Sequence, residues 1–152
     1  MNLWQRYEKT NCACPSQGIS FRYEKGIDQD LRNSFLRFSR WLRKKYVFPV
    51  HLTVYILNRE KVRLRNGALV YGSFRWYPHR SPRIRVPSKA EAECSGECTL
   101  DEIHEMILSS LVHEITHYYQ WVSALEQTNA DSERQANYYR FRIIDQYYAD
   151  PV

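Results

Sequence analysis

The chain lacks a long hydrophobic run. None of its apolar stretches approaches the roughly eighteen residues that a membrane-spanning helix needs, and residues 1–9 carry charges where a signal peptide would need its apolar segment. Internal repeats and low-complexity tracts are also missing. We therefore expect a soluble cytoplasmic protein. With 152 residues and 43% hydrophobic content, the sequence favours a single domain, residues 1–152, with its own core.

An H-E-x-x-H motif occupies residues 113–117. It lies within residues 99–122, whose apolar positions repeat at helical spacing, and Thr99 followed by Glu102 is typical of a capping box at a helix start. On a helix the two histidines of the motif project one turn apart, so both imidazoles can reach one metal ion. Glu114 lies beside that ion, where it can act as general base on a zinc-bound water. The alternative is a helix in which these three residues have only structural roles.

A zinc hydrolase site needs a third protein ligand and an open position for water. The chain has no histidine after His117, so the third ligand must be of another type. Residues 133–148 predict a second helix, preceded by residues typical of a helix start, and Glu133 lies in its first turn. Glu133 is the favoured ligand. Glu126 follows the metal helix too soon for an easy chain reversal, and Asp131 is better explained as a helix cap.

These residues give the chain a resemblance to the gluzincin metallopeptidases, in which a glutamate on a following helix is the third zinc ligand. It looks most like the small minigluzincins and ImmA-type regulatory peptidases, and less like the SprT-like peptidases, which would have a third histidine downstream. The similarity is sharp over residues 99–148, where an E-x-x-A-N-x-aromatic pattern begins at Glu133. It implies a zincin-like zinc peptidase with His113, His117 and Glu133 as metal ligands and Glu114 as general base.

The four cysteines form two close pairs, and three interpretations compete. The favoured one is a structural zinc site of four thiolates that joins the N-terminal arm, residues 1–27, to the loop before the metal helix, because short-spaced thiols in a cytoplasmic chain suit zinc. Two disulfides across the same contact, or unliganded thiols, are the alternatives. In a further variant, one N-terminal cysteine occupies the catalytic zinc and keeps the enzyme latent. The residues are Cys12, Cys14, Cys94 and Cys98.

The periodicity before the metal helix predicts a first helix and several strands. The helix covers residues 28–46, with Leu31, Phe35, Phe38 and Leu42 on one face. An Asn66-Gly67 pair between the second and third strands predicts a hairpin turn. We therefore expect an α+β fold: an N-terminal helix, a small mostly antiparallel sheet, the H-E-x-x-H helix and a C-terminal ligand helix. The expected strands are 51–57, 61–65, 68–76 and 83–86.

Two further sets of residues are candidates for substrate contacts. The last strand, just before the metal helix, is expected at the edge of the sheet, where its main chain could pair with an extended peptide. Its residues are Arg83, Ile84, Arg85 and Val86. An ordinary half-buried strand is the alternative. Tyr138 or Tyr139 could donate a hydrogen bond to a developing oxyanion, and nothing in the sequence selects between them.

Charge is distributed unevenly along the chain. Residues 1–88 carry 18 Lys and Arg against 5 Asp and Glu, whereas residues 89–152 carry 4 against 12. The basic half favours contact with nucleic acid or an acidic protein, although a solvated surface explains the same pattern. Two hypotheses follow. One is a zinc metallopeptidase that hydrolyses peptide bonds in a peptide or protein substrate. The other is a non-catalytic or latent zinc domain that acts as a regulatory or nucleic-acid-binding module. No membrane partner is expected.

Overall fold

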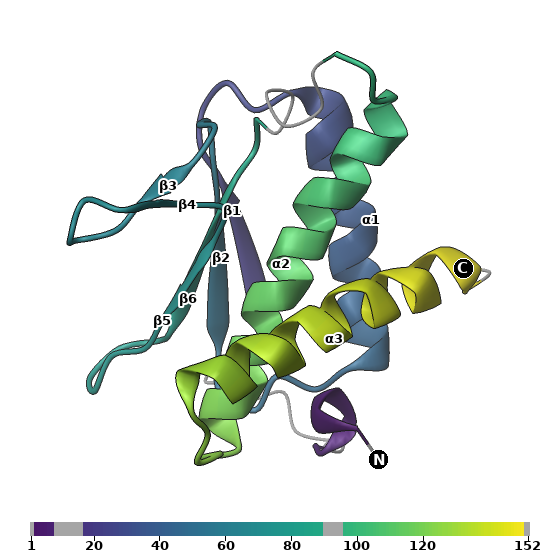
Figure 1. Ribbon diagram of the computed structural model, residues 1–152. Coiled ribbons are helices and arrows are strands. Elements are labelled where there is room, and N and C mark those ends of the chain that lie inside the picture. Colours follow the sequence, from purple (N-terminus) through teal and green to yellow (C-terminus); the bar gives the residue numbers. More distant parts are fainter. Residues whose placement is uncertain (1, 8–16, 90–95, 151–152) are drawn as a thin grey trace.

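Three α-helices lie on one side of a small sheet, with α3 packed on α2, in the computed structural model, which describes residues 2–7, 17–89 and 96–150 (Figure 1). The chain is therefore α+β, as expected from the sequence. Its elements are η1 (Leu3–Gln5), β1 (Ile19–Tyr23), α1 (Gln29–Lys45), β2 (Leu52–Leu57), β3 (Val62–Arg63), β4 (Leu69–Val70), β5 (Ser73–Arg75), β6 (Arg83–Pro87), α2 (Leu100–Val122) and α3 (Asn129–Ala149).

The main sheet is mixed, with strand order β1-β2-β6-β5. β1, β2 and β6 run parallel to one another, and only β5 is antiparallel to its neighbour. The expectation of a mostly antiparallel sheet is therefore wrong. Parallel neighbours need a crossover connection, and α1 supplies it between β1 and β2. Because β1 falls in residues 1–27, which the sequence assigns to an N-terminal arm, this crossover is not evident from the strand pattern.

The edge of the sheet next to α2 is β5, not β6. β6 pairs with β2 on one side and with β5 on the other, so the expected edge strand at residues 83–86 is an interior strand. Its alternation of half-buried arginines with buried Ile84 and Val86 reflects a strand with one core face and one outer face. The separate β3–β4 hairpin turns at Asn66-Gly67, as predicted, and Gly67 has the positive φ of 86° that such a turn requires.

The predicted helices are confirmed to within a few residues. The apolar face of α1 is buried, and Thr99 and Glu102 form the capping box expected at the start of α2. α3 begins earlier than residue 133, because the hydroxyl of Thr128 caps it by accepting a hydrogen bond from the backbone nitrogen of Asp131. Within the described ranges, none of the helices combines the length and hydrophobicity of a bilayer span.

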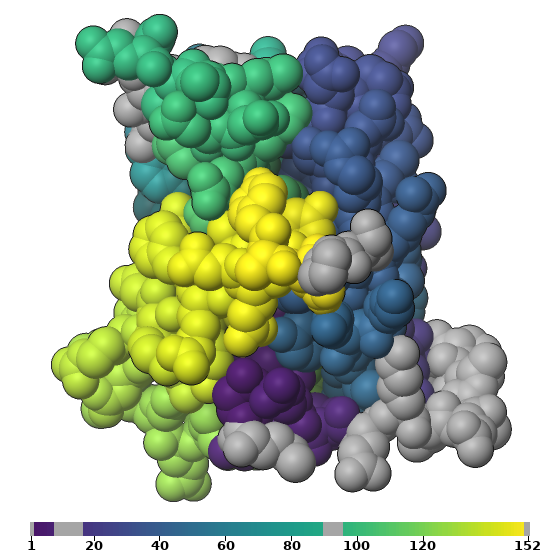
Figure 2. Space-filling view, turned by 90° about the vertical axis from the view of Figure 1, so that its right-hand side faces the viewer, coloured from purple at the N-terminus to yellow at the C-terminus, as the bar shows by residue number. Residues whose placement is uncertain are grey.

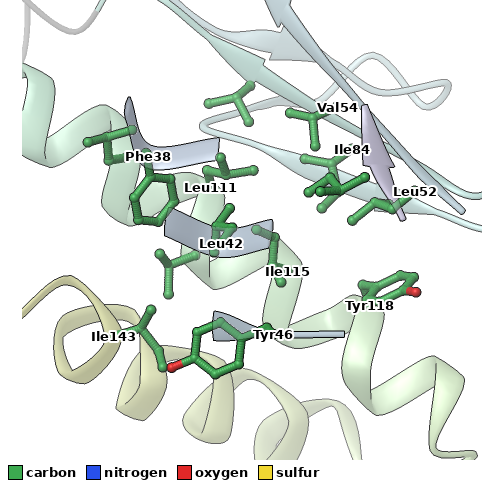
Figure 3. Packing of buried hydrophobic residues seen from close by; sticks show 14 of the residues in the cluster. Phe38, Leu42, Tyr46, Leu52, Val54, Ile84, Leu111, Ile115, Tyr118 and Ile143 are labelled. Atoms are coloured by element: carbon green, nitrogen blue, oxygen red, sulfur yellow. The ribbon is translucent and has the colours of Figure 1, made fainter. Parts of the chain in front are cut away.

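One hydrophobic core joins the sheet to the helices. Figure 3 shows buried side chains of α1 and α2 beside those of β2 and β6, with Ile143 of α3 on the helix side of the same cluster, near Tyr46. The N-terminal segment also packs into this core, and Figure 2 shows it beside α3. There the buried Trp4 donates a hydrogen bond from its indole nitrogen to Thr116 Oγ1 at 3.1 Å. Because Thr116 precedes His117, this bond fixes α2 at the level of the motif.

Candidate metal centre

Two helices bring three potential metal ligands together. His113 and His117 lie one turn apart on α2, and their Nε2 atoms are 3.3 Å apart. Glu133, in the first turn of α3, places one carboxylate oxygen 3.1 Å from His113 Nε2 and the other 3.0 Å from His117 Nε2. One ligand atom from each residue lies within 4.8 Å of the others. The spacing inferred from the sequence thus brings these three residues, the metal triad, to one point.

The donor set and its spacing fit a zinc ion. Two nitrogens that bind one tetrahedral zinc, each at about 2.0–2.1 Å, lie about 3.3 Å apart, and the Nε2 atoms of His113 and His117 have this separation. Two imidazoles and a carboxylate are also the ligands of catalytic zinc sites that keep a fourth position open. Glu133 completes the set from the side of α3, because the small Ala136, fully buried one turn further, allows the two helices to approach closely.

A network around Gln120 fixes the orientation of His117. The Nδ1 atom of His117 lies 2.8 Å from Gln120 Oε1, which can only accept, so Nδ1 carries the proton and Nε2 has a free lone pair. Gln120 in turn contacts α3: its amide nitrogen donates to Ser132 O and to Gln135 Oε1, and Ser132 Oγ donates to Gln120 Oε1 at 2.7 Å. The same side chain therefore orients a ligand and joins the two helices that carry the triad.

The surroundings of His113 favour its neutral form. Burial lowers the pKa of His113, the neighbouring His117 lowers it further, and Glu133 opposes both effects. Neutral imidazole is the form that binds metal ions. The Nδ1 atom of His113 is buried without a hydrogen-bond partner.

Glu114 is buried beside the triad, with only 8% of its surface exposed. Burial raises the pKa of Glu114 to about 8, the Glu133 carboxylate raises it as well, and Arg140 opposes both. Its side chain lies against the backbone just before β5. A Cβ atom at Gly72 would be 3.0 Å from Glu114 Cγ and 3.2 Å from Oε1. A side chain at position 72 would therefore press on Glu114, which would have to shift by a few tenths of an ångström.

Two adjoining pockets share Glu114, Glu133, Val70 and Gly72 as lining residues. The larger, of about 620 Å³, has an apolar wall that includes Phe74, Trp76, Trp121 and Leu125. The smaller, of about 290 Å³, is lined by His113, Ser110, Tyr71 and Arg140. The triad and Glu114 therefore lie in a groove between β5, α2 and α3, with an apolar end and a polar end.

Arg140 is a residue of the site that the motif does not reveal. It lies two turns after Glu133 on α3 and donates hydrogen bonds to Ser109 Oγ at 3.1 Å and Ser110 Oγ at 3.4 Å. Its charge lies close enough to Glu114 to affect the pKa values of both groups. The signal available in the sequence is its position on the same stripe of α3 as Glu133 and Ala136.

The other candidates lie away from the triad. Tyr139 is buried, and its hydroxyl accepts a hydrogen bond from the backbone nitrogen of Leu3. Tyr138 is exposed and contacts the Tyr139 ring, and neither tyrosine lines the two pockets around Glu114. Glu126 is exposed, and Asp131 pairs with Arg134 in the first turn of α3. The structure thus brings Glu133, and neither of these two acidic residues, to the histidines.

The cysteine site falls largely outside the described residues. Cys12, Cys14 and Cys94 are not among the described residues, and Cys98, the fourth, is disulfide-bonded. This state of Cys98 matches the second interpretation of the cysteines, and a disulfide sulfur offers no thiolate to zinc. The favoured interpretation, a zinc site of four thiolates that includes Cys98, is therefore wrong for this residue. The pairing of the other three cysteines stays a prediction.

The fold and site define a class of centre: two histidines and a carboxylate on adjacent helices, with a buried glutamate beside them in a groove. Comparison with known protein families, characterised proteins and solved structures gives no match for this chain. The functional assignment therefore rests on the geometry of the triad and of Glu114.

Proposed function

We propose that this protein is a zinc-dependent metallopeptidase with a zincin-like fold and the gluzincin ligand arrangement. The observation that carries the proposal is the convergence of His113, His117 and Glu133, with the buried Glu114 next to them. A helix that used its histidines only structurally would not need a carboxylate from another helix within 3.1 Å of both. Nor would it need a second, buried carboxylate facing the same groove.

The residues of the site suit peptide hydrolysis. Zinc, when bound, polarises the scissile carbonyl and lowers the pKa of its bound water. The charge of a bound zinc ion would favour the carboxylate form of Glu114 over the protonated form that burial favours. As a carboxylate, Glu114 would accept a proton from the attacking water and pass it to the leaving amine, because it lies beside the triad in the shared wall of the two pockets. Arg140, in the smaller pocket, offers a cation to a carbonyl or carboxylate oxygen of the substrate.

The edge strand beside the groove is suited to hold the substrate. Among the described strands, β5 pairs only with β6, so its other edge offers main-chain groups to an extended peptide. Phe74 and Trp76 of this segment line the larger pocket, where a side chain of the peptide would meet an apolar wall. This assigns to residues 73–75 the role that the sequence suggests for residues 83–86, and it favours peptides with a large apolar residue near the scissile bond.

Metal content and cleavage together test the proposal. We expect wild-type protein purified without added metal to carry zinc by mass spectrometry, and the His113→Ala/His117→Ala variant to lose one equivalent. Glu114→Gln should keep that zinc but lose cleavage of a mixed peptide library by roughly a hundredfold or more, because the proton acceptor is removed. Glu126→Gln, the same change at an exposed position, is the matched control. Zinc content unaffected by the double histidine variant, or full cleavage by Glu114→Gln, would overturn the proposal.

A further inference from the structure

The face of the main sheet that points away from the helices carries aligned rows of arginine, tyrosine and hydroxyl side chains. Residues directly opposite each other in a sheet lie on the same face. The register places Arg22, Tyr55, Arg85 and Ser73 in one row across the four strands. It places Ser20, Thr53, Arg83 and Arg75 in the next row. We call these eight residues, with Tyr77 just after β5, the arginine face.

The arginine face is not part of the core. Alternate residues of the same strands, such as Val54 and Ile84, are buried under α1 and α2, and Figure 1 shows all three helices on that side of the sheet. Residues of the two rows are half-buried or exposed. Among residues 2–7, 17–89 and 96–150, no helix covers them. The β3–β4 hairpin projects on this side at one end of the sheet, beside β6, and the remaining part of the rows is open to a partner.

The arginines gather without acidic partners. The guanidinium carbons of Arg75, Arg80 and Arg83 lie 5.3, 3.9 and 5.4 Å from the centre of the Tyr77 ring. In the part of the chain that the structure describes, none of the ion pairs involves an arginine of this face. Burial lowers the pKa of Arg85, and the charges of Arg83, Arg75 and Arg59 lower it further.

Two polar atoms of this cluster also lack hydrogen bonds. Arg83 Nε and the Tyr77 hydroxyl are buried without a partner. Like charges held together and donors left unbonded both cost free energy. A bound anion would offset both costs. The cluster therefore has the features of an anion-binding surface and not those of an ordinary solvated one, where charges of both signs alternate.

The chemistry of the face selects among polyanions. Its cations are all arginines, whose planar guanidinium groups bind phosphate through two parallel hydrogen bonds. Serine and threonine hydroxyls between them can donate to phosphate oxygens. Tyr55, between Arg22 and Arg85 in its row, offers an aromatic ring on which a base can stack. An acidic peptide has no base that would stack on the Tyr55 ring. A surface that binds membranes would instead carry lysines together with exposed apolar side chains.

The dimensions suit a single strand. Four strands at about 4.8 Å spacing make a face about 14 Å across, comparable to sheets on which two or three bases stack. None of the described helices projects from this face to enter a duplex groove. We propose that the arginine face binds single-stranded nucleic acid without strong sequence preference, with phosphates on the arginines and a base on Tyr55. This site lies on the opposite side of the sheet from the metal triad and does not depend on the peptidase assignment.

Fluorescence anisotropy with labelled oligo(dT), oligo(U) and a duplex of equal length, at several salt concentrations, tests the proposal. We expect the full chain to bind both single strands more tightly than the duplex. Arg75→Gln/Arg85→Gln should weaken binding at least tenfold at low salt and reduce the slope of log affinity against log salt by about 1.4, as for two lost phosphate contacts. Tyr55→Leu should weaken binding roughly tenfold with an unchanged slope.

Matched variants distinguish loss of binding at the arginine face from a general effect of net charge and from misfolding. Arg40→Gln/Lys44→Gln removes the same charge from the exposed surface of α1 and should retain wild-type affinity. Arg22→Glu, at an exposed position, should weaken binding in a protein whose circular dichroism and zinc content are unchanged. Equal losses in the arginine-face and α1 variants would overturn the proposal. So would duplex binding as tight as single-strand binding, or binding of polyglutamate or phosphatidylserine vesicles in place of the oligonucleotides.

Discussion

Gln120 connects the candidate metal site to the start of α3. Its oxygen accepts the His117 proton, and its amide nitrogen contacts Ser132 and Gln135 at the start of α3. In longer H-E-x-x-H-x-x-G-x-x-H motifs this position is glycine. Here a side chain occupies it, and that side chain links one histidine ligand to the helix that carries Glu133.

We expect Gln120→Leu to lower zinc affinity about 10–100-fold, because His117 loses the partner that fixes its tautomer and ring orientation. Competition with a chromophoric chelator measures the change. Gln127→Leu is the control, since Gln127 is exposed and also donates to Gln135 but does not contact His117. If the two variants bound zinc equally well, orientation of His117 by Gln120 would have no energetic role.

Gly72 is the second single residue on which the site depends. Adding one methyl group there forces the Glu114 side chain to move, since the new Cβ would lie 3.0 Å from Glu114 Cγ. We expect Gly72→Ala to reduce kcat roughly tenfold or more through misplacement of the proton acceptor, with zinc content unchanged. Assays of cleavage and metal content on the same preparation distinguish this from unfolding. A variant with normal kcat would show that Glu114 tolerates displacement.

Among single residues, the sequence could reveal only those with a fixed spacing. His113 and His117 are identified by the helical repeat, and Glu133 by its place in the next helix. Gln120 and Gly72 have no such signal, and Arg140 has only its position on the same stripe of α3 as Glu133. The roles of all three arise from how α2, α3 and β5 meet. The convergence of the three candidate ligands was therefore predictable, but the residues that surround them were not.

At the level of elements, α2 and α3 are both capped by a threonine, but the two caps lie at different distances from the triad. Thr99 caps α2 far from the metal, 14 positions before His113, whereas Thr128 caps α3 within one or two turns of Ser132 and Glu133. Both hydroxyls accept a backbone hydrogen bond, so their loss should cost similar stability. Only the cap of α3 belongs to the turn that positions the third ligand.

Thr99→Ala and Thr128→Ala should each lower the free energy of unfolding by about 1 kcal/mol. Thr128→Ala should in addition weaken zinc binding, because fraying of the first turn of α3 frees Glu133. Chemical denaturation of both variants and chelator competition measure these effects, and Thr99→Ala serves as the matched control. Equal zinc affinities would mean that Ala136 packing and Gln120 hold the first turn of α3 without its cap.

Elements defined by local periodicity were predicted well, and those defined by pairing were not. The apolar stripes of α1 and α2 repeat within a few residues, so the chain itself reveals them. The neighbours of a strand are distant in sequence: β2 pairs with β1 across α1, and with β6 across the β3–β4 hairpin. The alternating arginines of residues 83–86 indicated a two-faced strand correctly but could not show whether it lay at an edge.

On the scale of the whole molecule, three buried phenols tie the helices to the N-terminal segment. Tyr46, Tyr118 and Tyr119 pack with Trp4 and Phe48 where α1, α2 and η1 meet. The hydroxyls of Tyr118 and Tyr119 donate to backbone carbonyls after α1. Burial raises the pKa of Tyr46 to about 12 and also raises those of Tyr118 and Tyr119 above their ordinary value.

These shifts predict alkaline unfolding. Below pH 10 the phenols are protonated in both the folded and the unfolded state, so their contribution is constant. Above pH 10 the unfolded chain loses protons that the folded protein retains, and the free energy of unfolding falls by about 1.4 kcal/mol per pH unit for each such group. For three groups this loss is large against a total stability of about 5–15 kcal/mol. Circular dichroism and phenolate absorbance should therefore change together between about pH 10 and 12.

Variants of single tyrosines make the argument quantitative. Above pH 10, the free energy of unfolding of Tyr46→Phe should fall less steeply than that of the wild type, by the contribution of one proton. The variant should be less stable at neutral pH, because it loses the hydrogen bond to Gln146 Oε1. Tyr138→Phe, at an exposed tyrosine, should leave the slope unchanged. A smooth phenolate titration near pH 10, with circular dichroism constant to pH 12, would mean that these rings reach solvent in the folded state. The aromatic rings around Trp4, which pack against α2, would then be less tightly packed than their contacts indicate.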